Sequence, residues 1–227
     1  MKLENKYAQI LEEVDLTART VGRSPQEITL IAVCKNHTVE EISAVHQAGC
    51  LNFGENRLQE ALPKMDALPQ EIQWHLIGTL QKNKVNKALG RFALIHSVDS
   101  FELAEKISEA SQKQELRTKI LIQVNTSGES TKHGFTPQSF AEIVEELAVL
   151  PHLDLEGLMT MAPLDATEKE IHTYFSRLRK LRDETQLRLG ASHHFHHLSM
   201  GMSHDFKIAI EEGATLLRVG TAIFSDR

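Results

Sequence analysis

The sequence contains little cysteine, few aromatic residues and no excess of positive charge. Its 227 residues include only two cysteines, Cys34 and Cys50, too few for the disulfide framework of a small secreted protein. Aromatic residues make up 5% of the chain, and the formal net charge is −6. Both values argue against a nucleic-acid-binding protein, because that class uses basic surfaces and, for single strands, aromatic stacking platforms.

Two kinds of hydrophobic segment are also missing. No apolar run approaches the roughly 18 residues of a membrane-spanning helix. The first residues, MKLENK, carry charges where a secretory signal needs its apolar core. Pro-, Ser- or Gly-rich linkers are absent as well. We therefore expect one globular domain over residues 1–227, located in the reducing cytoplasm.

Short apolar runs rich in β-branched residues recur along the chain, and amphipathic segments of helical period separate them. The candidate strands are residues 28–33, 51–53, 74–77, 92–98, 119–124, 153–161, 195–200 and 215–220. The candidate helices are residues 3–20, 39–49, 99–114, 140–150, 168–189 and 205–213. The strands are apolar almost throughout, which is typical of parallel strands that are covered on both faces.

Eight strands that alternate with helices predict an α/β fold, a single (β/α)8 TIM barrel with an extra N-terminal helix. The alternative is a doubly wound open sheet, which is expected to carry a glycine-rich turn after its first strand. Here Cys34, Lys35, Asn36 and His37 follow that strand, and none of them is glycine. The pattern therefore favours the barrel.

The last two strands end in residues suited to a phosphate group. In barrels of this kind, phosphate commonly binds at the loops after strands 7 and 8. Ser199 and Gly201 end strand 7, and Gly220 and Thr221 follow strand 8. Glycine allows close approach of the backbone, while N–H groups and hydroxyls donate hydrogen bonds. The alternative is that the two glycines serve only in turns.

Lys35 directly follows the apolar first strand, so we expect its side chain to start at the mouth of the barrel. Desolvation or a nearby cation raises the neutral fraction of a lysine, which can then form a Schiff base with a carbonyl group. Opposite a phosphate site, such a lysine suits pyridoxal 5′-phosphate (PLP) or a sugar phosphate of a Schiff-base aldolase. The alternative is an ordinary lysine in solvent.

Arg218 separates these two ligands. It lies two residues before Gly220 and so shares a strand face with it. A guanidinium only donates hydrogen bonds. Facing a pyridine nitrogen, it would keep that nitrogen unprotonated and weaken the ring as an electron sink. We therefore favour PLP held with little catalysis, although Arg218 could instead form an interior ion pair.

The run His193–His197 raises the question of a metal. His194 and His196 share one strand face, but the usual spaced metal-binding motifs are missing. We expect polar packing and no metal site. For Cys34 we expect a small buried side chain rather than a reactive thiol.

Eight segments of the chain resemble a known family. They are LIAVCK (30–35), FGENRLQE (53–60), WHLIGTLQKNK (74–84), IHSVDS (95–100), QVNTSGESTKHGF (123–135), EGLMTM (156–161), LSMGMSHD (198–205) and LRVGTAIF (217–224). These motifs resemble the pyridoxal phosphate homeostasis protein family, whose members are similar to the N-terminal barrel of alanine racemase. The resemblance runs from about residue 28 to the C-terminus.

The resemblance implies a fold-type-III PLP barrel and a set of cofactor-binding residues. Lys35 would bind PLP covalently, and Arg218 would face the pyridine nitrogen. The residues implied to hold the phosphate are Ser199, Gly220 and Thr221. Asn56 and His75 lie in family motifs that line the same mouth.

The resemblance also implies a role in vitamin B6 homeostasis: binding PLP in the cytoplasm, passing it to apo-enzymes and turning over no substrate. Alanine racemase has a second domain and a catalytic tyrosine. Here the chain ends shortly after the last strand, and its only tyrosines, Tyr7 and Tyr174, lie in expected outer helices. We therefore assign no catalytic residue and expect a monomer. The alternatives are a weak PLP-dependent amino-acid racemase or lyase with Lys35 as its single base and, less favoured, the aldolase.

Overall fold

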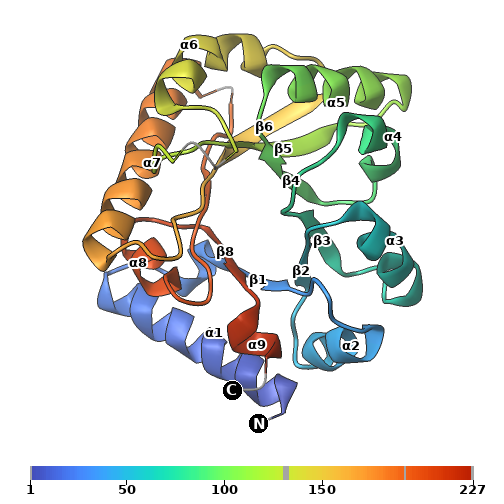
Figure 1. Ribbon diagram of the computed structural model, residues 1–227, viewed down its shortest axis with the longest axis vertical. Coiled ribbons are helices and arrows are strands. Elements are labelled where there is room, and N and C mark those ends of the chain that lie inside the picture. The colour runs from blue at the N-terminus through green and yellow to red at the C-terminus, as the bar shows by residue number, and fades with distance from the viewer. Residues whose placement is uncertain (1, 130–132, 192, 226–227) are drawn as a thin grey trace.

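Eight parallel strands close into a barrel in the computed structural model, which describes residues 2–129, 133–191 and 193–225 (Figure 1). The strands are β1 (Thr29–Val33), β2 (Asn52–Glu55), β3 (Gln73–Leu76), β4 (Leu94–Val98), β5 (Thr118–Gln123), β6 (Leu153–Met159), β7 (His197–Ser199) and β8 (Leu216–Val219). Their order around the barrel is their order in the sequence, and β1 pairs with β8, with Ile31 opposite Arg218. The predicted barrel is confirmed, and each expected run supplies one strand.

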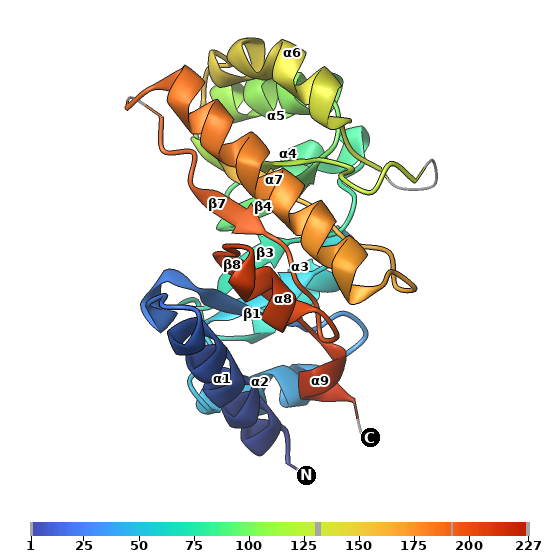
Figure 2. The same ribbon diagram turned by 90° about the vertical axis from the view of Figure 1, so that its left-hand side faces the viewer.

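Helices connect the strands and surround the barrel (Figures 1 and 2). The α-helices are α1 (Leu3–Thr20), α2 (Val39–Gln47), α3 (Leu58–Ala67), α4 (Val85–Ala88), α5 (Phe101–Lys113), α6 (Pro137–Ala148), α7 (Glu168–Leu189), α8 (Phe206–Glu211) and α9 (Thr221–Phe224). Two 3-10 turns, η1 (Pro25–Glu27) and η2 (Lys82–Lys84), precede β1 and α4. Capping boxes start α2, at Thr38 and Glu41, and α7, at Thr167 and Glu170. Within the described ranges, no helix is long and apolar enough to cross a lipid bilayer.

Three helices were not expected from the sequence: α3, α4 and α9. In α3, Pro63 lies inside the helix and removes one backbone hydrogen bond, which normally indicates a break. The helix forms nevertheless because Leu58 and Ala61 are buried, and Leu62 and Met65 pack against the same core. Helices α4 and α9 have four residues each, too few for a periodic pattern.

The N-terminal helix α1 closes the outside of the barrel where the first and last strands meet. It packs against α2, α8 and α9 and buries Tyr7, Ile10, Val14 and Ala18. Figure 1 shows both chain ends on this side of the molecule. The extra helix predicted before the first strand is confirmed, and it covers the outer face of the β1–β8 junction.

The barrel interior is apolar at one level and polar at the next. A separate cluster, contributed by strands alone, contains Ile31, Leu94, Leu121, Met159 and Leu216. Side chains along a strand alternate between its two faces. The inward-facing positions two residues further along β4 and β8 are therefore His96 and Arg218, both buried. The interior thus becomes polar just below the C-terminal strand ends, where a barrel carries its functional site.

Candidate functional site

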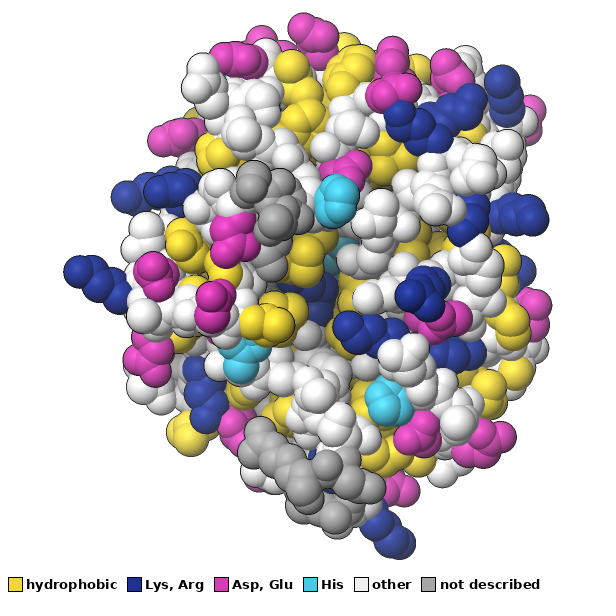
Figure 3. All heavy atoms as spheres, in the orientation of Figure 1, with side chains coloured by type: hydrophobic (Ala, Val, Ile, Leu, Met, Phe, Trp, Pro, Cys, Tyr) yellow, Lys and Arg dark blue, Asp and Glu magenta, His cyan; other side chains and the backbone are white. Residues whose placement is uncertain are grey.

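A cavity of about 1060 Å³ opens at the C-terminal ends of the strands. In Figure 3 it is the hollow in the middle of the face, with Lys and Arg side chains inside and beside it. Its volume is at the upper end of the roughly 300–1,000 Å³ of small-molecule sites. Five of the residues predicted from the sequence line it: Lys35, Asn56, Arg218, Gly220 and Thr221.

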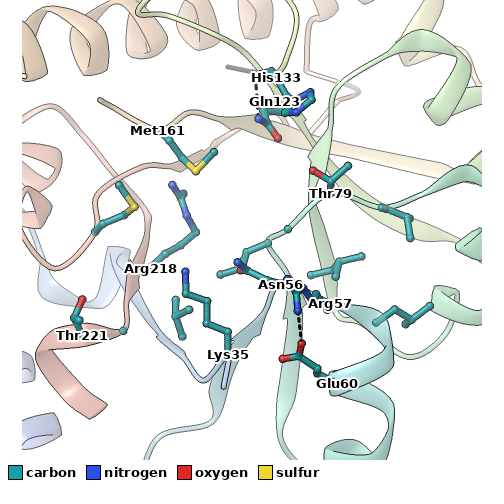
Figure 4. Close-up of a pocket in the computed structure, with 18 of the residues that line it drawn as sticks. Lys35, Asn56, Arg57, Glu60, Thr79, Gln123, His133, Met161, Arg218 and Thr221 are labelled. Carbon is teal, nitrogen blue, oxygen red and sulfur yellow. Dashed lines mark hydrogen bonds and ion pairs between the residues drawn. The ribbon is translucent and has the colours of Figure 1, made fainter. Parts of the chain in front are cut away.

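Lys35 reaches the cavity from the end of β1. Ile31 and Val33 point into the barrel, and Lys35 continues this alternation one step beyond the strand. The chain then turns at Asn36, whose φ of 64° lies in the left-handed region that asparagine tolerates better than most residues. Figure 4 shows the Lys35 amine extending into the cavity beside the Arg218 guanidinium.

Arg218 is a buried cation with neutral partners. Only 4% of its surface is exposed, and it lines the cavity from β8. Its Nη1 donates to Ser199 Oγ at 2.5 Å and its Nη2 to the carbonyl oxygen of Thr160 at 2.9 Å. Burial lowers the pKa of Arg218 to about 10, so the guanidinium stays charged at neutral pH. No carboxylate of the described residues lies within ion-pair distance, so the interior ion pair considered above does not form.

Polar groups at the end of β8 form a donor set that suits an anion. The hydroxyl of Ser203 accepts hydrogen bonds from the backbone N–H of Gly220 at 3.3 Å and of Ala222 at 3.2 Å. The Thr221 hydroxyl lies 3.3 Å from the same oxygen. These groups meet at the Ser203 oxygen, and backbone N–H groups and hydroxyls gathered in this way are the ligands of protein-bound phosphate.

The structure places Ser199 beneath the cavity rather than in its lining. Ser199 is the last residue of β7, and its side chain points into the barrel interior, where it is fully buried. Its hydroxyl is occupied by Arg218 and by His96 Nδ1 at 2.8 Å, and the residue does not line the cavity. The serine at the phosphate-type donor set is Ser203, in the loop after β7.

His75 also lies outside the cavity lining, although the resemblance implies a place at the mouth. It is buried in β3, where its Nε2 lies 3.1 Å from Asn52 Oδ1 and its Nδ1 lies 2.9 Å from His96 Nε2. Burial lowers the pKa of His75 to about 4, so the ring is neutral at pH 7. It therefore belongs to the polar layer beneath the cavity.

An unexpected buried ion pair supports the β1 and β2 side of the site. The Lys64 amine, from α3, binds the Glu55 carboxylate and also donates to the carbonyl oxygen of Cys34 at 2.9 Å. Glu55 also accepts the backbone N–H of Asn56 at 3.1 Å. This ion pair therefore holds the backbone directly before Lys35 and that of Asn56. Nothing in the sequence links Lys64 to β1, since the contact depends on how α3 packs.

Gly78 fixes the position of Asn56 from the other side. A Cβ atom at residue 78 would lie 2.3 Å from the backbone oxygen of Asn56, so only glycine fits. Gln123 and Met161 complete the opposite wall of the cavity (Figure 4). The end of the third strand at Gly78 is among the candidate positions in the sequence, whereas Gln123 and Met161 were not singled out.

The two remaining chemical candidates lie elsewhere. Cys34 is fully buried, and burial raises the pKa of its thiol well above the usual value, which fits a small packed side chain. In the histidine run, His197 Nδ1 lies 3.1 Å from Thr215 Oγ1, and the His194 and His196 rings lie 5.4 Å apart. Among the described residues, no three metal-ligating side chains come together.

Comparisons with known proteins agree with this geometry. The family model for the N-terminal domain of alanine racemase matches residues 9–227. A pyridoxal phosphate homeostasis protein from Aquifex aeolicus (strain VF5) is 40% identical over 223 residues, covering 98% of this chain and 97% of that protein. The chain belongs to the pyridoxal phosphate homeostasis protein family. The resemblance stated from the sequence is thereby confirmed.

Other members of the pyridoxal phosphate homeostasis protein family match over nearly the same length. The one from Pseudomonas aeruginosa is 38% identical over 226 residues, which covers 99% of this chain and 96% of that protein. The solved structure of PipY from Synechococcus elongatus PCC7942 with PLP bound has a TM-score of 0.82 at 37% identity, covering 95% of this chain and 100% of PipY. An alanine racemase from Clostridium difficile 630, at 15% identity and a TM-score of 0.74, covers 96% of this chain and 59% of its own and shares the fold.

Proposed function

We propose that this protein binds PLP as a Schiff base on Lys35 and takes part in intracellular PLP homeostasis without substantial catalytic turnover. One observation carries the proposal: the Lys35 amine, the Arg218 guanidinium and the donor set of Ser203, Gly220 and Thr221 line one cavity. The two free, buried thiols, Cys34 and Cys50, fit the reducing cytoplasm expected from the sequence. PLP bound to the relative PipY supports the ligand assignment.

The groups in the cavity match the chemical parts of PLP. The phosphate suits the N–H groups of Gly220 and Ala222 and the hydroxyls of Ser203 and Thr221. The pyridine nitrogen suits Arg218, which can donate to it but cannot accept from it. The aldehyde suits the Lys35 amine. These residues come from β1, the loop after β7 and the end of β8, so adjacent strands supply all three contacts.

The covalent step needs no oxidant or further reactant. The neutral Lys35 amine adds to the aldehyde carbon, a C=N bond replaces the C=O bond, and the oxygen leaves as water. When bound, PLP supplies an electron-accepting ring. Arg218 limits this property because a guanidinium that donates to the ring nitrogen leaves it unprotonated.

The positions of the tyrosines support a role without turnover. A two-base racemase needs a second acid–base group across the cofactor from the lysine. Tyr7 is buried in α1, where burial raises the pKa of its hydroxyl, and Tyr174 lies in α7. Neither lines the cavity. No tyrosine of the described residues thus lies opposite Lys35, so we favour a protein that holds PLP and passes it to apo-enzymes.

A PLP titration of the purified protein tests the proposal. We expect a yellow protein that keeps its colour through gel filtration, loses it on mixing with an apo-enzyme that needs PLP, and gives no α-deuterium exchange with L-alanine in D₂O. The measurements are the visible spectrum, the regained activity of the apo-enzyme, and NMR. A protein that stays colourless with added PLP would contradict the binding; rapid exchange would instead support the racemase or lyase.

Ser203→Ala should weaken PLP binding while Ser127→Ala, which lies outside the cavity, should not. Removing a hydrogen bond to a charged group typically costs about 1.5–3 kcal/mol, so we expect the Kd to rise roughly tenfold or more. Among the described residues, the Ser127 hydroxyl forms hydrogen bonds with Asn125 and Glu129 of its own loop. Equal Kd values for the two variants would show that Ser203 does not contact the phosphate.

A further inference from the structure

A chain of hydrogen bonds crosses the polar layer beneath the cavity, and the proposed function does not use it. It runs from Asn52 to His75 at 3.1 Å, from His75 to His96 at 2.9 Å, from His96 to Ser199 at 2.8 Å and from Ser199 to Arg218 at 2.5 Å. The five residues lie on β2, β3, β4, β7 and β8. The chain therefore links opposite sides of the barrel and ends at the cation of the cavity.

The chemistry of the donors gives this chain one direction. Asn52 Oδ1 can only accept, so His75 donates to it from Nε2. With both rings neutral, His75 Nδ1 accepts from His96 Nε2, and His96 Nδ1 accepts from the Ser199 hydroxyl. The Ser199 oxygen in turn accepts from Arg218, which can only donate. Each neutral ring thus has one donor, one acceptor and a single tautomer.

Burial favours the same neutral forms. Burial lowers the pKa of His96 well below the usual value and that of His75 to about 4. His75 on β3 and Arg218 on β8 lower the pKa of His96 further, and His197 on β7 acts on both rings in the same direction. Asp205, in the loop after β7, acts on Arg218 rather than on the rings.

The neutral chain positions Arg218 without cancelling its charge. A carboxylate in place of Ser199 would also orient the guanidinium but would form an ion pair with it and draw its donors away from the cavity. The rigid rings of His96 and His75 instead fix the Ser199 oxygen, and that oxygen fixes Nη1. Thr160 fixes Nη2 through a neutral carbonyl oxygen. Among the described residues Arg218 thus donates to no carboxylate, and its positive charge, which Asp205 opposes from beyond ion-pair distance, remains available to a ligand.

We propose that His96, backed by His75, is a positioning residue that acts through Ser199 to hold Arg218 toward a neutral, hydrogen-bond-accepting ring nitrogen of the ligand. Neither histidine lines the cavity, so each acts at a distance. That the ring nitrogen belongs to PLP rests on the proposed function. The tautomers of His96 and His75, and the way they hold Arg218, do not depend on it.

Nitrogen-15 NMR of histidine-labelled protein without PLP tests the chain itself. We expect both His96 and His75 to be protonated on Nε2 alone at pH 7, with no change down to about pH 5. Ser199→Ala should remove the hydrogen bond to His96 Nδ1 and shift that resonance. An imidazolium, or a proton on Nδ1 of either ring, would overturn the proposal. This result does not depend on whether PLP binds.

PLP binding by His96 variants tests the positioning. His96→Leu removes both hydrogen bonds, whereas His96→Gln keeps one acceptor and one donor. The matched control is His197→Gln on β7. We expect His96→Leu to weaken PLP binding roughly tenfold or more, because the Arg218 guanidinium is then no longer held where it donates a hydrogen bond to the ligand. The visible band of bound PLP should also become pH-dependent, because the ring nitrogen is then free to take up a proton.

The outcomes separate the two proposals. Recovery of affinity and spectrum by His96→Gln, with His197→Gln like wild type, supports the positioning role. Wild-type affinity and an unchanged, pH-independent band in folded His96→Leu would overturn it. If the wild-type protein itself fails to bind PLP, the proposed function fails, and the NMR experiment still decides whether the neutral chain exists. Circular dichroism confirms that each variant is folded.

Discussion

Lys35→Ala is expected to abolish the visible absorption that PLP gives with the wild-type protein. Without the amine no Schiff base forms at this position, and the aldehyde keeps the spectrum of free PLP. The change should affect the fold little, because Lys35 is exposed at the end of β1 and substitutions of this kind usually change the free energy of unfolding by about 0.5 kcal/mol or less. The measurements are the visible spectrum and the mass of the protein after borohydride reduction.

Lys84→Ala provides the matched control for this experiment. Lys84 lines the same cavity from η2, which follows β3, so it tests whether any lysine in the cavity can react. We expect Lys84→Ala to stay yellow and to take up one reduced PLP at Lys35. Trapping of PLP at Lys84 in the wild-type protein, or a yellow Lys35→Ala protein, would contradict the assignment of Lys35.

The residues placed correctly from the sequence are those whose position depends only on where a strand ends. Lys35 follows β1, and Gly220 and Thr221 follow β8, so the barrel rule alone brings them to one face. Arg218 was placed by alternation along β8. Such rules need the strand and its direction but no side-chain packing.

The positions of Ser199 and His75 below the cavity lining have a common physical cause. Strand β7 has only three residues, so the sequence does not show whether its last serine points inward below the cavity or belongs to the loop above it. Ser199 lies beneath the cavity and Ser203 lines it, and both belong to the segment LSMGMSHD (198–205). His75 lies one inward position below the cavity floor, where its partner His96 comes from a different strand. One step along a strand thus separates a ligand contact from a support.

Contacts between distant elements could not be predicted at all. The Glu55–Lys64 pair depends on α3, a helix with an internal proline that the sequence pattern did not indicate. The monomeric state and the single-domain organisation stay predictions. The structure adds two sets of contacts that hold the site in place. A chain of neutral hydrogen-bonding groups lies beneath Arg218. The buried Glu55–Lys64 ion pair lies behind Lys35 and Asn56.

Lys64→Met is expected to cause a large loss of stability. The Glu55 side chain is fully buried and that of Lys64 is 12% exposed, so removing the amine leaves a carboxylate without its counter-charge in the protein interior. Breaking a buried ion pair from one side typically costs about 3–5 kcal/mol. The variant also loses the hydrogen bond to the Cys34 carbonyl oxygen, so the backbone before Lys35 loosens. The measurement is urea unfolding followed by circular dichroism.

Two further variants determine whether this loss comes from burial of the unpaired charge. Lys207→Met removes an ion pair with Glu13 that is 2.8 Å long but lies at the surface, with side chains 56% and 31% exposed, so it should cost at most about 1 kcal/mol. Lys64→Met combined with Glu55→Gln removes both charges and should recover most of the stability, because no unpaired charge stays buried.

If Lys64→Met and Lys207→Met lose equal stability, the pair behind Lys35 is no stronger than a surface contact. If the double variant regains stability but binds PLP poorly, the ion pair serves the geometry of the site. In the wild-type protein the Lys64 amine holds the Cys34 carbonyl oxygen, and with it the backbone that leads to Lys35.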